Sequence, residues 1–214
     1  MYFYRRLSFL CLFFFPAQAM QPHIIVLDPA GDSHNPGRVI EDTFERTIAW
    51  RCATYVQEQL TARNDTIAVF ITRQSGDFSA PLQRAQYVNR IAAHAVVSLS
   101  FYQATETADI FLYMYGNGDD FFPIINPLGW YTADQAHLLC AKEHGALAAL
   151  FYTHFMQHCH TYASVHAPYK IPCTALFGMA VPACLIEIGL KKADDWQWYG
   201  DHLVAVLEKA CNVW

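Results

Sequence analysis

The chain has 214 residues, of which 54% are apolar, 15% aromatic and only 15% charged. Globular domains carry about a quarter charged residues, so this apolar composition excludes an intrinsically disordered chain. Fourteen Lys and Arg against nineteen Asp and Glu residues give a formal net charge of −5, with no basic cluster. Nucleic acid is therefore excluded as an expected partner, because binding a phosphate backbone requires clustered cations. The length fits one domain.

The first 19 residues have the layout of a secretory signal peptide. Arg5 and Arg6 precede an apolar run, Leu7–Phe15, and the small-residue site Ala17–Ala19 follows. This pattern predicts cleavage after residue 19 and a secreted or periplasmic domain over 20–214. An uncleaved membrane anchor is the alternative, but the nine-residue run is too short for a hydrocarbon core ~30 Å thick. No membrane partner is expected after cleavage.

Six cysteines remain after the predicted cleavage: Cys52, Cys140, Cys159, Cys173, Cys184 and Cys211. An even number in an exported protein permits disulfides. Most of these residues have apolar neighbours, where a free cysteine behaves as a small buried hydrophobe. Disulfides and buried thiols both stay open, and no pairing is predicted.

Hydrophobic periodicity predicts strands that alternate with helices. The expected strands are 23–28, 66–72, 95–100, 109–115, 172–177 and 184–188. The expected helices are 41–60, 81–92, 134–158 and 194–210, with loops over 119–131 and 161–171. The alternation indicates a single α/β domain, with a mixed, mostly parallel central sheet of about six strands flanked by helices.

Polar residues gather where the predicted strands end, which is where open α/β sheets bind ligands. Asp28 ends the first strand, and Ser98 and Ser100 end the third. Glu187 lies inside an otherwise apolar strand. A carboxylate at such a position is costly unless it is paired, metal-bound or catalytic, so Glu187 is a candidate functional residue.

Several motifs occur in an order and spacing that resemble one enzyme family. Asp28–Ser33 resembles Asp-Pro-Gly-His-Gly-Gly, Ser98–Tyr102 resembles Ser-Ile-His-Ala-Asn, and Pro182–Leu190 resembles Pro-Ala-Val-Leu-Val-Glu-Leu-Gly-Phe. Further matches are Glu41 heading the first helix, Ala49, Ala53, Thr72-Arg73, Arg84 and Val88-Asn89. Together these segments resemble the zinc-dependent N-acetylmuramoyl-L-alanine amidases of peptidoglycan metabolism, over essentially the whole predicted mature chain.

The resemblance implies a zinc ion held by a His, a Glu and a second His. At those positions this chain has Gly31, Glu41 and Ser100, and it keeps Glu187 at the general acid/base position. Glycine has no donor side chain and a neutral hydroxyl suits zinc poorly, so two metal-ligand positions are lost. We therefore expect a degenerate, zinc-free member, inactive or weakly active and without a cofactor, that binds peptidoglycan or a cell-wall protein.

The alternative is an active metal-dependent amidase that hydrolyses the muramoyl–L-alanine bond at a rebuilt site. Asp32 and His34 follow the lost histidine on the same loop and could join Glu41 around zinc or a harder cation. Their more ordinary role is to cap a turn. A third alternative is a structural or host-facing secreted protein that keeps only the fold.

Other candidate residues have a structural interpretation that we favour. His154 and His158 share a helix face, but the Glu of a His-Glu-x-x-His motif is missing, so they are expected on the polar face of a helix end. Arg73 and Arg84 are expected to make structural ion pairs or helix-end contacts. Aromatic residues expected to fill the core or anchor loops, with sugar stacking as the alternative, are Phe121, Phe122, Trp130, Tyr131, Trp196, Trp198 and Tyr199.

Overall fold

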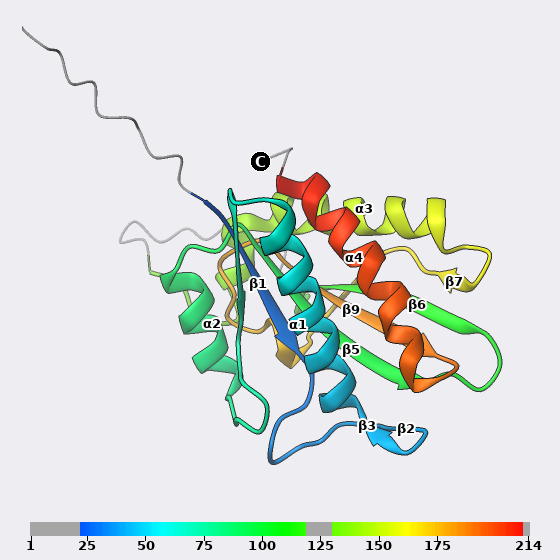
Figure 1. Cartoon of the computed structure of the whole chain (residues 1–214). Helices are drawn as coiled ribbons and strands as arrows, with labels where there is room; N and C mark the ends of the chain where they lie inside the picture. The colour runs from blue at the N-terminus through cyan, green and yellow to red at the C-terminus, as the bar shows by residue number, and fades with distance from the viewer. Residues whose placement is uncertain (1–21, 119–129, 212–214) are drawn as a thin grey trace, which may run out of the picture.

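The structure, a computed structural model, describes residues 22–118 and 130–211 (Figure 1). The predicted signal peptide and most of the predicted 119–131 loop, with Phe121 and Phe122, lie outside the described residues. The strands are β1 (His23–Pro29), β2 (Val39–Ile40), β3 (Thr43–Phe44), β4 (Ile67–Ile71), β5 (Ala95–Gln103), β6 (Ala108–Tyr115), β7 (Ala163–Val165), β8 (Tyr169–Ile171) and β9 (Ala183–Leu190). The helices are α1 (Glu45–Arg63), α2 (Pro81–Arg90), α3 (Ala141–His158) and α4 (Trp196–Cys211).

The central sheet has seven strands in the order β4-β1-β5-β9-β6-β7, with β8 also paired to β6. The β6–β9 pair is antiparallel, and the other recorded pairs of this sheet are parallel. This arrangement confirms the predicted α/β fold with a mixed, mostly parallel sheet, which has one strand more than expected. β2 and β3 form a separate antiparallel hairpin before α1.

Helices cover the two faces of the sheet unequally. The larger core cluster joins one face to α1, α3 and α4, whereas a smaller cluster joins the other face to α2. Figure 1 shows α1 and α4 side by side over the sheet. On β9, Ile186 and Ile188 enter the larger cluster. Because side chains alternate along a strand, Glu187 lies on the opposite face, outside the three-helix layer.

Three boundaries predicted from the sequence are wrong. α1 begins at Glu45 rather than at Glu41, because residues 39–44 pair as a hairpin before the helix. The predicted loop 161–171 contains β7 and β8, which are short strands that add to the outer side of β6. The predicted strand 172–177 contains instead the 3₁₀ turn Thr174–Leu176, and of this run only Leu176 is buried, in the smaller cluster with α2.

All six cysteines of the predicted mature chain are free thiols. Burial raises the pKa of Cys52, Cys140, Cys159 and Cys184 to about 12. A thiol with so high a pKa stays protonated near neutral pH and reacts slowly, because the thiolate is the nucleophile. These residues therefore act as small core side chains.

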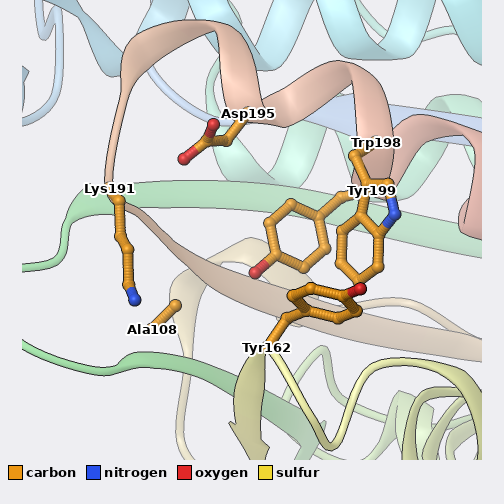
Figure 2. Close-up of a pocket in the computed structure, with 6 residues that line it drawn as sticks. All are labelled: Ala108, Tyr162, Lys191, Asp195, Trp198 and Tyr199. Atoms are coloured by element: carbon orange, nitrogen blue, oxygen red, sulfur yellow. The ribbon is translucent and has the colours of Figure 1, made fainter.

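The aromatic residues have mixed positions. Trp196 and Tyr199 are buried as expected, whereas Trp130 and Tyr131 are exposed. Trp198 and Tyr199, at the start of α4, line a cavity near the end of β9 (Figure 2). Within the described ranges, no helix is both long and apolar enough to cross a bilayer.

A cluster of three histidines joins α3 to α4. His154 and His158 have ring centroids 4.5 Å apart, and His154 Nε2 lies 3.2 Å from Nδ1 of His202. The expectation that His154 lies on a polar helix face is wrong, because it is only 5% exposed. Burial and the neighbouring basic groups lower the pKa of His154 to about 4.

The His154 pKa predicts a loss of stability in acid. A histidine whose folded-state pKa is lowered binds its proton more readily when unfolded, so its contribution is complete above pH ~6.5 and is lost as the pH falls toward 4. We expect a loss of up to about 3 kcal/mol from this residue, and the variant His154→Leu should lose less stability than the parent chain over that range. Urea unfolding from pH 7 to 4 measures this difference. The exposed-site variant His160→Gln is the control and should follow the parent chain.

Candidate functional site

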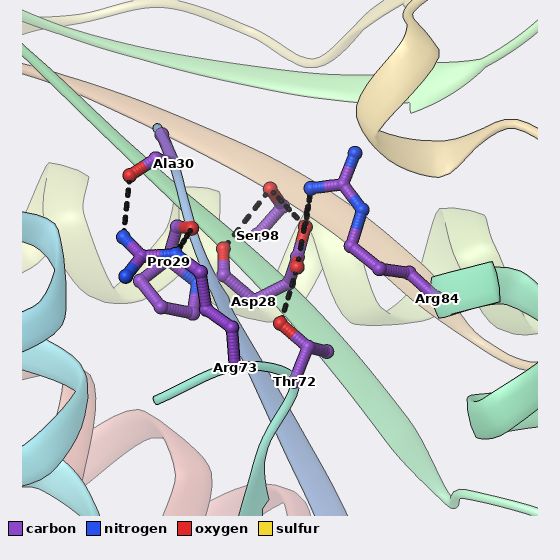
Figure 3. A network of polar contacts seen from close by, with 7 residues as sticks. All are labelled: Asp28, Pro29, Ala30, Thr72, Arg73, Arg84 and Ser98. Atoms are coloured by element: carbon purple, nitrogen blue, oxygen red, sulfur yellow. Dashed lines mark hydrogen bonds and ion pairs between the residues drawn. The ribbon is translucent and has the colours of Figure 1, made fainter. Parts of the chain in front are cut away.

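The carboxyl ends of β1 and β4 and the middle of β5 meet around the buried carboxylate of Asp28. Its oxygens accept hydrogen bonds from Thr72 Oγ1 at 2.6 Å and Ser98 Oγ at 3.1 Å. Arg84 of α2 adds an ion pair at 3.1 Å (Figure 3). Asp28 has no exposed surface, so these donors replace the water that its charge has lost.

Arg73 holds the loop that follows β1. Its guanidinium donates hydrogen bonds to the carbonyl oxygens of Pro29 and Ala30 (Figure 3), and to that of Arg46, between 2.9 and 3.2 Å. Burial lowers its pKa, an effect that Asp28 opposes. The structural roles expected for Arg73 and Arg84 are confirmed.

Glu45, the first residue of α1, is the buried carboxylate nearest to β5. Its Oε1 accepts hydrogen bonds from Ser100 Oγ at 2.6 Å and from the Phe101 N–H at 3.0 Å. Its Oε2 accepts the Arg38 N–H at 3.1 Å. A carboxylate at the start of a helix is also stabilised by the helix dipole. Four contributions therefore hold this charge in place.

Two glycines let the loop approach α1. A Cβ on Gly37 would lie 2.6 Å from Glu45 Oε2, and a Cβ on Gly31 would lie 2.7 Å from the Cβ of Arg46. Both glycines have positive φ values, +77° and +73°, which side chains disfavour. The backbone at Gly31 therefore leaves no room for a side chain without moving α1 or the loop.

Arg38 and Glu187 form an ion pair beside this site. The guanidinium lies 2.5 Å from Glu187 Oε1, and the Tyr113 hydroxyl donates to Oε2 at 3.2 Å. Burial alone would lower the pKa of Arg38, but the hydrogen bond and charge of Glu187, with the charge of Glu45, raise it overall. Arg38 therefore stays a cation that faces two carboxylates.

The ion pair forms part of an open groove of about 530 Å³. Tyr102 and Phe111 contribute aromatic walls, and the Arg38 guanidinium lies 5.6 Å from the centre of the Tyr102 ring. Asp109, which also lines the groove, accepts hydrogen bonds from Tyr102 and pairs with His166. The groove thus combines ring surfaces with charged groups.

Glu41 does not reach this site. It lies in the turn between β2 and β3 with φ +50°, and its carboxylate accepts the Ala193 N–H at 2.7 Å. The glutamate that heads the first helix, and therefore has the position that the resemblance assigned to Glu41, is Glu45. The helical apolar spacing did not mark where the helix starts. Sequence reasoning also missed Arg38 and Tyr113.

Asp32 and His34 do not gather around Glu41. Asp32 Oδ1 accepts the N–H groups of His34 and Asn35, both at 2.8 Å, which is a turn-capping role. His34 is exposed and stacks on Phe78 with ring centroids 4.6 Å apart. In the part of the chain that the structure describes, no group of three or more His, Cys, Asp or Glu residues is placed to hold a metal ion.

The donors around Glu45 also fit zinc poorly. Ser100 offers a neutral hydroxyl that it donates to Glu45, and Gly31 offers no side chain. The nearby Arg38 brings a positive charge, which repels a cation. A catalytic zinc site needs three ligands of the imidazole, thiolate or carboxylate type, and this set has one.

The fold and the edge at which these carboxylates lie define an α/β domain with a charged site at one edge of its sheet. The family model described as N-acetylmuramoyl-L-alanine amidase matches residues 25–202. The match spans most of the chain, so the chain belongs to this family.

Solved structures show the same fold. The CwlV catalytic domain of Bacillus (Paenibacillus) polymyxa var. colistinus is 16% identical, with a TM-score of 0.66 over 89% of this chain and 99% of that one. Ami1 of Mycobacterium smegmatis is 15% identical, with a TM-score of 0.67 over 91% and 99%. AmiC2 of Nostoc punctiforme is 16% identical, with a TM-score of 0.61 over 87% and 93%. No curated protein matches the chain.

Removing the charge of Asp28 should destabilise the whole edge. The variant Asp28→Asn leaves the half-buried Arg84 without its partner, and we expect a loss of about 3 kcal/mol in the free energy of unfolding. Urea denaturation measures this loss. The double variant Asp28→Asn/Arg84→Met should recover part of it, and Glu106→Gln, at an exposed site, should change little. A loss under about 1 kcal/mol for Asp28→Asn would contradict the role given to this carboxylate.

Proposed function

We propose that this protein is an exported, degenerate amidase that binds peptidoglycan or a cell-wall protein and hydrolyses the muramoyl–L-alanine amide weakly or not at all. The observation that carries this proposal is the cation beside the site carboxylates: Arg38 pairs with Glu187, and its charge interacts with that of Glu45. Membership of the family supports peptidoglycan as the surface on which the protein acts.

Amide hydrolysis needs an activated water and a group that polarises the carbonyl. In zinc enzymes the metal supplies both functions, since zinc-bound water has a pKa near 7 against ~15.7 for bulk water. Around Glu45 the donors do not suit zinc, so Glu187 would have to activate an ordinary water. Both oxygens of Glu187 already have donors, Arg38 on Oε1 and Tyr113 on Oε2. Glu187 is therefore better placed to anchor the groove than to act as a general base.

The groove itself supports a binding role. The half-buried Tyr102 and Phe111 offer ring surfaces, and Arg38, Asp109 and Glu187 offer charges and hydrogen-bonding groups. Aromatic faces with a few polar groups form a common lining of ligand sites. A protein partner has a precedent in the fold: CwlD of Clostridioides difficile, 13% identical with a TM-score of 0.60, was solved in complex with the GerS lipoprotein.

Activity and metal content separate the degenerate protein from a working amidase. We expect the purified protein to sediment with peptidoglycan sacculi, to hold substoichiometric zinc by mass spectrometry, and to release little or no stem peptide with or without added zinc. The variant Glu187→Gln should leave that residual release unchanged. Stoichiometric zinc together with release that Glu187→Gln abolishes would overturn the proposal in favour of a rebuilt metal site. If the sacculi retain neither the parent protein nor the variant, the partner is a cell-wall protein and not peptidoglycan.

Export gives a separate prediction. If residues 1–19 are a signal peptide, the protein recovered from the periplasm or medium begins at Met20. Intact-mass spectrometry measures this N-terminus directly. The variant Ala17→Asp/Ala19→Asp, which places charged residues at the expected cleavage site, should keep the longer form. Recovery of the unprocessed parent chain would contradict export by this route.

A further inference from the structure

A second cavity, of about 410 Å³, lies at the end of β9 and is separate in its lining from the Arg38–Glu187 groove. The start of α4 contributes Trp198 and Tyr199, and Tyr162 precedes β7 (Figure 2). Tyr162 and Trp198 meet edge to face with ring centroids 5.2 Å apart. This volume lies within the usual range of small-molecule sites.

The Tyr199 hydroxyl is a polar group that opens into this cavity. The residue is 96% buried, being only 4% exposed, yet its hydroxyl makes no hydrogen bond with any residue that the structure describes. Figure 2 shows this hydroxyl directed into the cavity, toward the side of Ala108 and Lys191. Burial, with nearby Cys159 and Asp195, raises the pKa of Tyr199, so its proton is available as a donor. A nearly buried hydroxyl that faces a cavity is a position for a ligand acceptor.

Two opposite charges stand on the same side of the cavity. Lys191 directly follows β9, and Asp195 ends the 3₁₀ turn η3 (Ala193–Asp195) before α4. Within the described ranges the two side chains form no ion pair with one another or with a neighbour. Asp195 Oδ2 accepts the Lys192 N–H at 2.9 Å, which orients the carboxylate and leaves Oδ1 for another donor.

From this geometry we infer that the cavity binds an α-amino-acid zwitterion with an apolar side chain. The carboxylate of the ligand pairs with Lys191 and accepts the Tyr199 hydroxyl, and its ammonium group pairs with Asp195. The apolar side chain packs on Tyr162, Trp198 and Ala108. This ligand gives a partner to the Tyr199 hydroxyl, to Lys191 and to the free oxygen of Asp195.

A neutral sugar would stack on the same rings, but it would leave both charges without a counterion. Charge-assisted hydrogen bonds are roughly twice as strong as neutral ones, so the charged pair favours the zwitterion. The inference concerns a different cavity from the one in the proposed function. It stands or fails independently of peptidoglycan binding.

Calorimetric titration of the purified full chain tests this inference with three matched probes. Leucine carries both charges, N-acetylleucine only the carboxylate and leucinamide only the ammonium group. We expect leucine to bind with one-to-one stoichiometry and each singly charged analogue to bind about tenfold more weakly or worse. N,N′-diacetylchitobiose is the sugar probe and should bind more weakly than leucine.

Three variants each remove one interaction while keeping the shape of the wall: Lys191→Met, Asp195→Asn and Tyr199→Phe. Asn at position 195 retains an oxygen for the Lys192 N–H, so the helix start is preserved. We expect each variant to weaken leucine binding about fivefold or more, whereas Lys192→Met, outside the cavity lining, should leave it unchanged. Circular dichroism confirms that each variant is folded. Absence of leucine binding by the folded parent, equal binding of all three probes, or chitobiose binding that the variants do not alter would overturn the inference.

Discussion

The carboxylate of Asp28 is the charge on which this edge of the molecule depends. It has no exposed surface, so its desolvation has to be offset by protein donors. The donors come from three places: Thr72 just after β4, Ser98 on β5 and Arg84 on α2. One buried charge therefore joins three adjacent parallel strands and ties α2 to the less covered face of the sheet. The apolar core packs the sheet, and this network holds the ends of β1 and β4 against the middle of β5.

The loop that begins at this edge also positions the functional groove. Arg73 donates hydrogen bonds to carbonyl oxygens of the loop after β1 and of α1, and so holds the two together. The loop reverses direction at Gly31 and Gly37, which both have positive φ values. Gly37 brings the backbone against Glu45, and the next residue, Arg38, then donates its N–H to that carboxylate and extends its side chain to Glu187. The positions of both site carboxylates thus follow from the buried network beneath them.

The sequence predicted the fold and part of the site for reasons that are physical. Parallel strands buried on both faces leave continuous apolar runs, and a carboxylate inside such a run, Glu187, is conspicuous because it is costly. Glu45 was missed because helical periodicity reports which face is buried and not where a helix begins. Arg38 and Tyr113 were missed because an exposed loop arginine and a strand tyrosine look ordinary until β6 and β9 are known to pair. His202 was missed because its histidine partners lie on another helix, and only the folded chain brings the two helices together.

The ion pair also bears on the proposal that this member of the family works without a metal. Neighbouring carboxylates repel one another, and a bound cation normally offsets that repulsion. Here Arg38 provides a covalently attached cation, whose pKa is raised by Glu187 and Glu45 and which is therefore present at every physiological pH. Ser100 contributes a hydroxyl that donates a hydrogen bond to Glu45, whereas an imidazole at this position could bind a metal ion. Under the proposed function, the residues that fit zinc poorly are therefore also the residues that stabilise the groove.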